Sequence, residues 1–196
     1  MTSFSAAPTL THNRVRLEQL SHVHASQLAE AAAEGELWAT WYTAIPAPHE
    51  MDAEIDRRLG LQAAGSMAPW AVIDPDTDRA VGMTTYMNID AANRRVEIGS
   101  TWLAKRVQRS GLNKAAKLLL LSRAFDDLDC IAVEFRTHWH NQQSRRAIAE
   151  LGAKQDGVLR NHQIDRFGTL RDTVSFSIIA SEWPTVRLGL EARLGA

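Results

Sequence analysis

The chain of 196 residues has only one cysteine, Cys130. A single cysteine excludes an intrachain disulfide and any CxxC metal site, and it fits a reducing cytoplasm. Because the apolar run 131–133 follows it, we interpret Cys130 as a buried strand residue. The alternative is a nucleophile, but free cysteines are commonly inert residues of the core.

The sequence also lacks long hydrophobic runs and an excess of either charge. No apolar stretch approaches the roughly twenty residues that span a bilayer, and no N-terminal segment combines a basic start with a long apolar core. The formal net charge of -1 and the pI near 6.7 argue against a general polyanion-binding surface. We therefore expect a soluble, cytoplasmic protein whose partners include neither nucleic acid nor a membrane.

Hydrophobic residues make up 45% of the chain, which is enough to bury the core of one domain. Residues 1–13 show no periodicity, so we expect a flexible leader followed by a single domain over residues 14–196. Strand and helix patterns occur in neighbouring groups rather than in strict βα order, which predicts an α+β fold with a mostly antiparallel sheet. Strands are expected near 15–20, 70–73, 80–89, 95–103, 130–136, 153–164 and 170–180, and helices near 22–33, 50–64, 109–126, 141–151 and after 181.

Between Leu103 and Lys117, an apolar strand ends in a basic turn and a long helix begins. Backbone N–H groups at a helix start lack intrahelical partners, and the helix dipole adds partial positive charge there. Such a turn suits a phosphate or pyrophosphate, with Gly111 permitting close backbone approach and three cations nearby, Arg106, Arg109 and Lys114. In the preceding strand, period-two alternation predicts one face made of Val96, Ile98, Ser100 and Trp102.

The segment Gln108–Asn113 resembles the Q/R-x-x-G-x-G/A acetyl-CoA signature of the GNAT acetyltransferase superfamily, and its surroundings are similar to the RimJ/RimL-like branch. Asn113 departs from the pattern, because Gly or Ala is usual there. The resemblance implies a GNAT fold, in which helices flank a central sheet that splays at the cofactor-binding strand, and acetyl-CoA as cosubstrate. It implies that backbone groups pair with the pantetheine at Ser100, Thr101, Trp102 and Leu103. It places the pyrophosphate on the amides of Gln108, Arg109, Ser110, Gly111, Leu112, Asn113 and Lys114.

The segment 141–152, NQQSRRAIAELG, resembles a second family motif, a helix in which an Asn contacts the cofactor and a Tyr protonates the leaving thiolate. Asn141 matches the Asn, whereas Ile148 stands at the Tyr position, and no tyrosine follows Tyr86. Because the RimL-like branch uses a serine at this point, we assign Ser144 as the group near the sulfur. On local sequence alone, Asn141 is a helix N-cap and Ser144 an ordinary first-turn residue.

Transfer to an amine requires a base, because a lysine-like amine has a pKa of about 10 and is protonated near neutrality. The family resemblance makes Glu97 our leading base, since it lies eleven positions before Gln108 on the strand that enters the turn. The alternatives for Glu97 are a surface ion pair and a structural partner for a buried arginine. Rival bases are Glu134, His138 and His140; the histidines, spaced by two with no third ligand nearby, do not predict a metal site.

Aromatic residues cluster before the Pro-containing segment 45–48. Trp38, Trp41 and Tyr42 occur at helical spacing, and we interpret them either as core or, through the family resemblance, as a wall of the acceptor cleft. Tyr86 is assigned to the same acceptor-binding group. The C-terminal helix has two interpretations as well, because its apolar residues would pack on the core or on a second subunit of a homodimer, namely Val186, Leu188, Leu190 and Leu194.

Two hypotheses from different classes follow. The first is an acetyl-CoA-dependent N-acetyltransferase that transfers the acetyl group directly, in a ternary complex, to the primary amine of a protein N-terminus or a small molecule. The second is a CoA-binding sensor or scaffold without turnover, which the missing tyrosine and the substituted Asn113 favour. Nothing in the sequence selects the acceptor, and the charge of the cleft that receives it is the observation that would.

Overall fold

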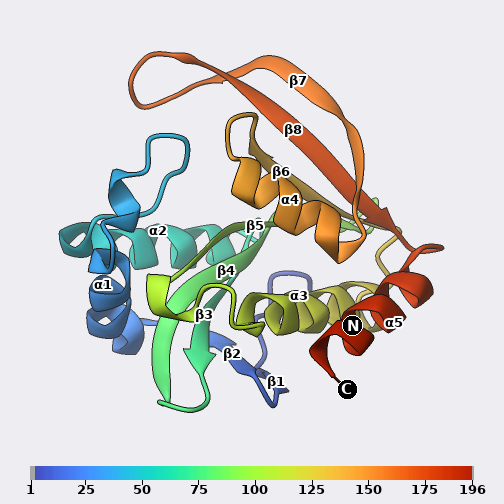
Figure 1. Ribbon diagram of the computed structural model, residues 1–196, viewed down its shortest axis with the longest axis horizontal. Coiled ribbons are helices and arrows are strands. Elements are labelled where there is room, and N and C mark those ends of the chain that lie inside the picture. The colour runs from blue at the N-terminus through green and yellow to red at the C-terminus, as the bar shows by residue number, and fades with distance from the viewer. Residues whose placement is uncertain (1–2, 196) are drawn as a thin grey trace.

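The computed structural model describes residues 3–195 as one eight-stranded sheet flanked by helices (Figure 1). The strand order is β1-β2-β3-β4-β5-β6-β8-β7, and all neighbours are antiparallel except β5 and β6. The strands are β1 (Leu10–His12), β2 (Val15–Gln19), β3 (Ala68–Asp74), β4 (Arg79–Asp90), β5 (Arg95–Leu103), β6 (Ala132–His138), β7 (Lys154–Ile164) and β8 (Leu170–Ile179). The helices are α1 (Ala25–Ala33), α2 (Met51–Ala63), α3 (Leu112–Ser122), α4 (Gln142–Leu151) and α5 (Trp183–Leu194). The α+β fold with a mostly antiparallel sheet is confirmed.

Different helices cover the two faces of the sheet at β5. On one face, the hydroxyl of Tyr86 in β4 donates to the carbonyl of Leu120 in α3. Side chains alternate along a strand, so Met87 points to the opposite face, where its sulfur lies 3.6 Å from Ser100 Oγ. Ser100 and Arg58 of α2 line one cavity on that second face. The strand that leads into the basic turn therefore lies between α3 on one side and α2 on the other.

The sheet opens between β5 and β6. The two strands pair at only three positions, which end with Glu97 opposite Glu134. Beyond this pair, β5 continues beside β4 and β6 continues beside β8, without pairing with each other. The splay that the family resemblance implied is therefore confirmed, and it begins at the residue we expected to be the base.

β5 also contains a β-bulge beside the opening. Its register with β4 shifts at Thr84, so that one extra residue of β5, among Ser100 and Thr101, has no partner of its own. Ser100 takes a φ of +46°, which non-glycine residues adopt rarely. The strict alternation expected along this strand is therefore wrong from Ser100 onward: Ser100 lies on the α2 face, and the extra residue turns Thr101 toward Lys117 of α3.

The expectation of a flexible leader over residues 1–13 is wrong over its described part, residues 3–13; Met1 and Thr2 lie outside the description. β1 adds to the edge of the sheet by pairing with β2, and Ala7 is buried. The indole N–H of Trp70 donates to the Pro8 carbonyl at 2.9 Å, and Arg123 donates to the Ala6 carbonyl at 3.0 Å. Buried donors of the core thus hold a segment that has no periodicity of its own.

The C-terminal helix packs on the core of its own chain. Val186, Leu190 and Leu194 of α5 are buried, and α5 packs against α3, whereas Leu188 is exposed. The core interpretation of this helix is therefore confirmed. Cys130 is buried as well, and burial raises the pKa of its thiol to about 11, which fits an inert residue better than a nucleophile.

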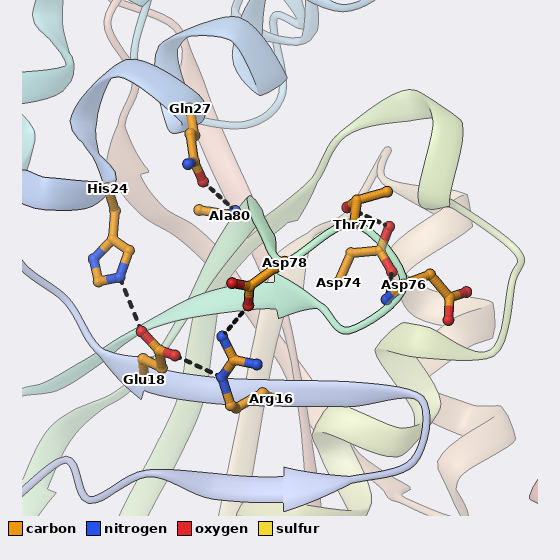
Figure 2. Close-up of polar contacts among 9 residues, drawn as sticks. All are labelled: Arg16, Glu18, His24, Gln27, Asp74, Asp76, Thr77, Asp78 and Ala80. Atoms are coloured by element: carbon orange, nitrogen blue, oxygen red, sulfur yellow. Dashed lines mark hydrogen bonds and ion pairs between the residues drawn. The ribbon is translucent and has the colours of Figure 1, made fainter.

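Polar side chains, most of them partly exposed, fasten β2 to the β3–β4 turn (Figure 2). The guanidinium of Arg16 lies 2.5 Å from both Glu18 Oε1 and Asp78 Oδ1, and His24 adds a contact to Glu18 at 3.3 Å. Ion pairs that water still reaches contribute about 0–1 kcal/mol each, so they fix β2 against this turn rather than carry the fold. Within residues 3–195, no helix is both long and apolar enough to cross a membrane.

Candidate active site

The turn between β5 and α3 is folded by its own side chains. Gln108 Nε2 donates to the Leu103 carbonyl at 3.0 Å, and the Ser110 hydroxyl donates to the Val107 carbonyl at 2.7 Å. Arg109 and Gly111 take φ values of +65° and +90°, so α3 begins at Leu112 and not at Arg109 as the pattern predicted. Gly111 is needed for its backbone angle, since a Cβ there would meet only ordinary contacts at 3.8 Å or more.

The first turn of α3 presents backbone N–H groups without intrahelical partners. Asn113 lies inside this turn and is helical, so the unusual backbone angles fall before it. Its Oδ1 is buried and has no partner among the described residues.

Arg109 is exposed and Lys114 half-buried, and neither makes an ion pair within residues 3–195. Arg106 is paired instead with Glu34 at the end of α1, so its expected role as a free cation is wrong.

Glu97 is a buried carboxylate at the mouth of the opening between β5 and β6, with 5% of its surface exposed. Its Oε2 accepts a hydrogen bond from Asn88 Nδ2 at 2.8 Å, and Arg136 Nε lies 3.6 Å away. Burial raises the pKa of Glu97, and neighbouring Glu134 adds to this effect, while Asn88 and Arg136 oppose it. Glu97 is therefore a candidate proton acceptor whose pKa is shifted toward neutrality.

Glu134 faces Glu97 across the last strand pair but is engaged differently. Its Oε1 is paired with Arg95 and its Oε2 accepts from Arg136 Nη2 at 3.0 Å. Both oxygens are thus committed to guanidinium groups, so neither is free to contact an incoming ammonium group. The geometry favours Glu97 over Glu134 as the group that receives a proton.

The expected acceptor wall and the two histidines lie together. The Trp41 ring centroid is 5.3 Å from that of His138 and 5.6 Å from that of His140, and Tyr42 lies 6.4 Å from His138. Nearly half of Trp41 is exposed (49%), and Trp38 is also partly exposed, so neither belongs to the core. The helical spacing of the three aromatic residues does not correspond to a continuous helix. Of this segment, Leu37–Ala39 forms a short 3-10 helix that ends before Trp41.

His138 is held in a particular protonation state. Its Nδ1 accepts the backbone N–H of His140 at 3.0 Å, so a neutral ring carries its proton on Nε2. Burial and the charge of Arg171 lower the pKa of His138, which keeps the ring neutral near pH 7. In this state the free edge of His138 is a hydrogen-bond donor and not a base.

Tyr86 is not part of the acceptor cleft, so this assignment is wrong. Its side chain is fully buried, its hydroxyl donates to the Leu120 carbonyl, and its ring packs edge-on against Trp70 at 5.0 Å. Burial raises the pKa of the Tyr86 hydroxyl well above its usual value. The residue faces α3 because of its position in the alternation of β4, which its sequence neighbours did not reveal.

α4 begins just after β6, on the far side of the opening from α3. Asn141 is its N-cap, with Oδ1 accepting the Ser144 backbone N–H at 3.0 Å, so the local interpretation of Asn141 is confirmed. The Ser144 side chain is half-buried, and Ile148, at the position of the family tyrosine, is buried in the core. Contacts of Asn141 and Ser144 with a cofactor remain predictions.

Sequence reasoning missed three cations near β5. Lys117 of α3 is buried and donates to Thr101 Oγ1, and Arg58 of α2 is buried and donates to the Ser100 carbonyl at 3.4 Å. Arg166, in the turn between β7 and β8, reaches the cavity that Arg58 and Ser100 line. The signal for the first two was a charged residue on the apolar face of an amphipathic helix. Arg166 gave none, because a charged residue in a hairpin turn is ordinary.

Comparison with known proteins assigns the family. The Acetyltransferase (GNAT) domain model matches residues 14–154. A Bacillus subtilis protein named as a ribosomal N-acetyltransferase, YdaF, is 31% identical over 102 residues, or 52% of this chain and 55% of the relative, so the match spans about half of that relative's length.

Solved structures agree over nearly the whole chain. One named as an acetyltransferase from T. thermophilus has a TM-score of 0.84 at 31% identity and covers 95% of this chain and 96% of its own. Mycobacterium smegmatis RimJ, in complex with CoA-disulfide, has a TM-score of 0.78 at 20% identity and covers 92% and 89%, which shows a shared fold. The chain therefore belongs to the GNAT acetyltransferase family, and its relatives support a place in the RimJ/RimL-like branch.

Proposed function

We propose that this protein transfers the acetyl group of acetyl-CoA directly to a primary amine, in a ternary complex. The observation that carries the proposal is the opening between β5 and β6, which begins at Glu97 and lies between the N-termini of α3 and α4. It brings an unpaired strand edge, two helix starts and a buried carboxylate to one place. The name of the YdaF relative supports a protein amine as acceptor, and a small-molecule amine is the alternative.

The residues present fit acetyl-CoA as the acetyl donor. Backbone N–H groups of the first turn of α3, together with Arg109 and Lys114, would hold the diphosphate. The edge of β5 from Ser100 to Leu103, which β6 leaves unpaired, would bind pantetheine amides as an added strand does. The Oδ1 of Asn113, which is buried and has no partner among the described residues, offers a further hydrogen-bond acceptor beside the turn. A donor of this kind also fits the expected cytoplasmic location.

In the proposed reaction, Glu97 accepts a proton from the acceptor ammonium, directly or through water. The amine nitrogen then forms a bond to the acetyl carbon, the carbon–sulfur bond breaks, and the proton that the nitrogen loses as the amide forms passes, directly or through water, to the leaving thiolate. The Ser144 hydroxyl supplies a hydrogen bond to the leaving sulfur. Glu97 suits its role because burial raises its pKa and because its Oε1, unlike both oxygens of Glu134, makes no hydrogen bond within residues 3–195.

The alternative, a CoA-binding sensor or scaffold, is favoured by one observation. Ile148 fills the tyrosine position with a buried aliphatic side chain, so α4 supplies no phenol as an acid. Thiol release from acetyl-CoA, measured with peptides and small amines, separates the two functions. Amine-dependent release supports the enzyme, whereas calorimetric binding of acetyl-CoA without release on any acceptor supports the sensor. No binding at millimolar ligand would overturn both.

A further inference from the structure

A cavity of about 480 Å³ lies over the β5 bulge on the α2 face of the sheet. Its floor includes Ser100, which is three positions after Glu97 on the same strand. The turn between β7 and β8 contributes Arg166, and the segment 44–46 contributes apolar wall. Since the proposed reaction takes place beside this stretch of β5, the cavity is positioned to hold the part of the acceptor next to its amine.

Two carboxylates line the cavity, and they are engaged within the protein to different degrees. Glu54 accepts hydrogen bonds from Arg57 at 2.7 and 2.9 Å and from Arg58 at 2.6 Å. Glu50 accepts from the Ala47 backbone N–H at 2.9 Å. Both oxygens of Glu54 are therefore committed to guanidinium groups. Glu50 has one hydrogen bond and no ion pair within residues 3–195, so it is the single uncompensated carboxylate among three arginines, a balance that disfavours a polyamine.

The guanidinium groups, in contrast, have donors to spare. Arg58 is 1% exposed, and its Nη1 has no hydrogen-bond partner within the described residues. Arg166 donates through Nη2 to the carbonyls of Trp38 and Thr40, and no carboxylate pairs with it within residues 3–195. The cavity thus combines three arginines with two carboxylates and keeps a net positive charge.

We propose that this cavity binds a carboxylate of the acceptor, with Arg166 and Arg58 as its donors. The inference rests on the proposed function and names the acceptor class: a primary amine on a molecule that also carries a carboxylate. Guanidinium groups match a carboxylate with two parallel hydrogen bonds, and such bonds are stronger away from bulk water. The apolar wall of Ala44, Ile45, Pro46 and Ala53 contacts the aliphatic part of the same molecule.

The test uses matched acceptors that differ only in this charge. One arm compares the dipeptide Ser-Gly with its C-terminal amide, and the other compares Ser-Asp-amide with Ser-Asn-amide. Each carboxylate acceptor should have a kcat/KM about tenfold higher or more, the scale of one charge-assisted hydrogen bond. A larger acid-to-amide ratio of kcat/KM in the Ser-Gly arm indicates a small acid as acceptor, and a larger ratio in the Ser-Asp arm indicates an acidic peptide N-terminus.

The variant Arg166→Gln should raise KM for carboxylate acceptors by a larger factor than KM for their amides, which lose only the contacts of Arg166 to the Trp38 and Thr40 carbonyls, and it should leave KM for acetyl-CoA unchanged. Arg160→Gln is the matched control, because it removes the same charge from the same hairpin, where Arg160 is largely exposed and outside the cavity. Equal kcat/KM for acid and amide in both arms, or equal loss in the two variants, overturns the inference while leaving the acetyltransferase intact.

Binding is the readout if no acceptor is turned over, a result that counts against the proposed function. Calorimetry of the complex with CoA would then compare the same four dipeptides. Tighter binding of the acids, lost in Arg166→Gln, supports the carboxylate site independently of turnover. Equal or absent binding of all four overturns it.

Discussion

Lys117 Nζ lies 2.7 Å from Thr101 Oγ1, in the bulge of β5, and contacts no carboxylate within the described residues. On the opposite face of the sheet, Arg58 donates to the carbonyl of Ser100. Two buried cations thus hold consecutive residues of the bulge from opposite sides. Burying charge is costly, so this arrangement persists because other contacts of the fold outweigh the cost. It fixes the strand at the point where we propose that pantetheine pairs with β5.

The first prediction concerns stability and the ionisation of Lys117, whose pKa burial lowers to about 7. In the unfolded chain its pKa is about 10.4, so the unfolded state binds more protons between these values. The destabilising cost, at most about 5 kcal/mol, is therefore fully present below pH 7 and is relieved as pH rises toward 10.

Replacing Lys117 by Met should remove this dependence and leave the Thr84–Thr101 hydrogen bond at 2.8 Å in place. Urea unfolding at several pH values from 6 to 9.5 measures it. The stability of the wild type relative to Lys117→Met should rise across this range. Parallel profiles for the two proteins would show that Lys117 does not titrate near 7.

A second prediction concerns Glu97→Gln. Because burial raises the pKa of Glu97, the acidic limb of the kcat/KM profile should lie above the ordinary glutamate pKa of about 4.3. The variant should lose about 100-fold in kcat at pH 7 and less at high pH, where the free amine needs no base. Glu134→Gln should have a smaller effect, and CoA affinity should not change. Activity of Glu97→Gln equal to wild type at all pH values would remove Glu97 from the mechanism.

A third prediction uses two glycines with opposite expectations. Gly111→Ala forces an L side chain to a φ of +90°, which costs about 1–2 kcal/mol and should weaken CoA binding through the turn. Gly60→Ala lies within α2 with open space for a Cβ, so it should stabilise the protein by about 0.5–1 kcal/mol. Thermal unfolding and CoA calorimetry measure both. Equal shifts would show that the turn angle at Gly111 is not required.

A fourth prediction separates structure from chemistry at α4. Only the backbone N–H of Ser144 takes part in the cap, so Ser144→Ala should leave stability nearly unchanged and lower kcat if its hydroxyl serves the sulfur. Asn141→Ala should lose about 1 kcal/mol of stability through the cap. Steady-state kinetics beside urea unfolding distinguishes the two effects. A kcat for Ser144→Ala equal to the wild-type value would assign proton supply to solvent.

Much of the candidate site was predictable, because its signals are local. Gly111 marked the turn, and the position of Glu97 before it placed a carboxylate on the strand that enters the turn. Tyr86 and Arg106 were assigned wrongly for a common reason: their surroundings are set by Leu120 and Glu34, which belong to other elements. Period-two alternation also failed at Ser100, because the unpaired residue of a bulge depends on the register with β4.

The sequence by itself determined the succession of strands and helices, the basic turn before α3 and the family, since hydrophobic period, turn residues and motifs are written along the chain. Only the tertiary structure decided where β5 leaves β6, which carboxylate keeps an oxygen free, and the positive charge of the cavity. These properties come from pairs such as Glu97 with Glu134, Glu134 with Arg136, and Arg58 with Ser100. Burial and charge compensation depend on neighbours in space, and those neighbours are brought together only when the sheet and its hairpin are complete.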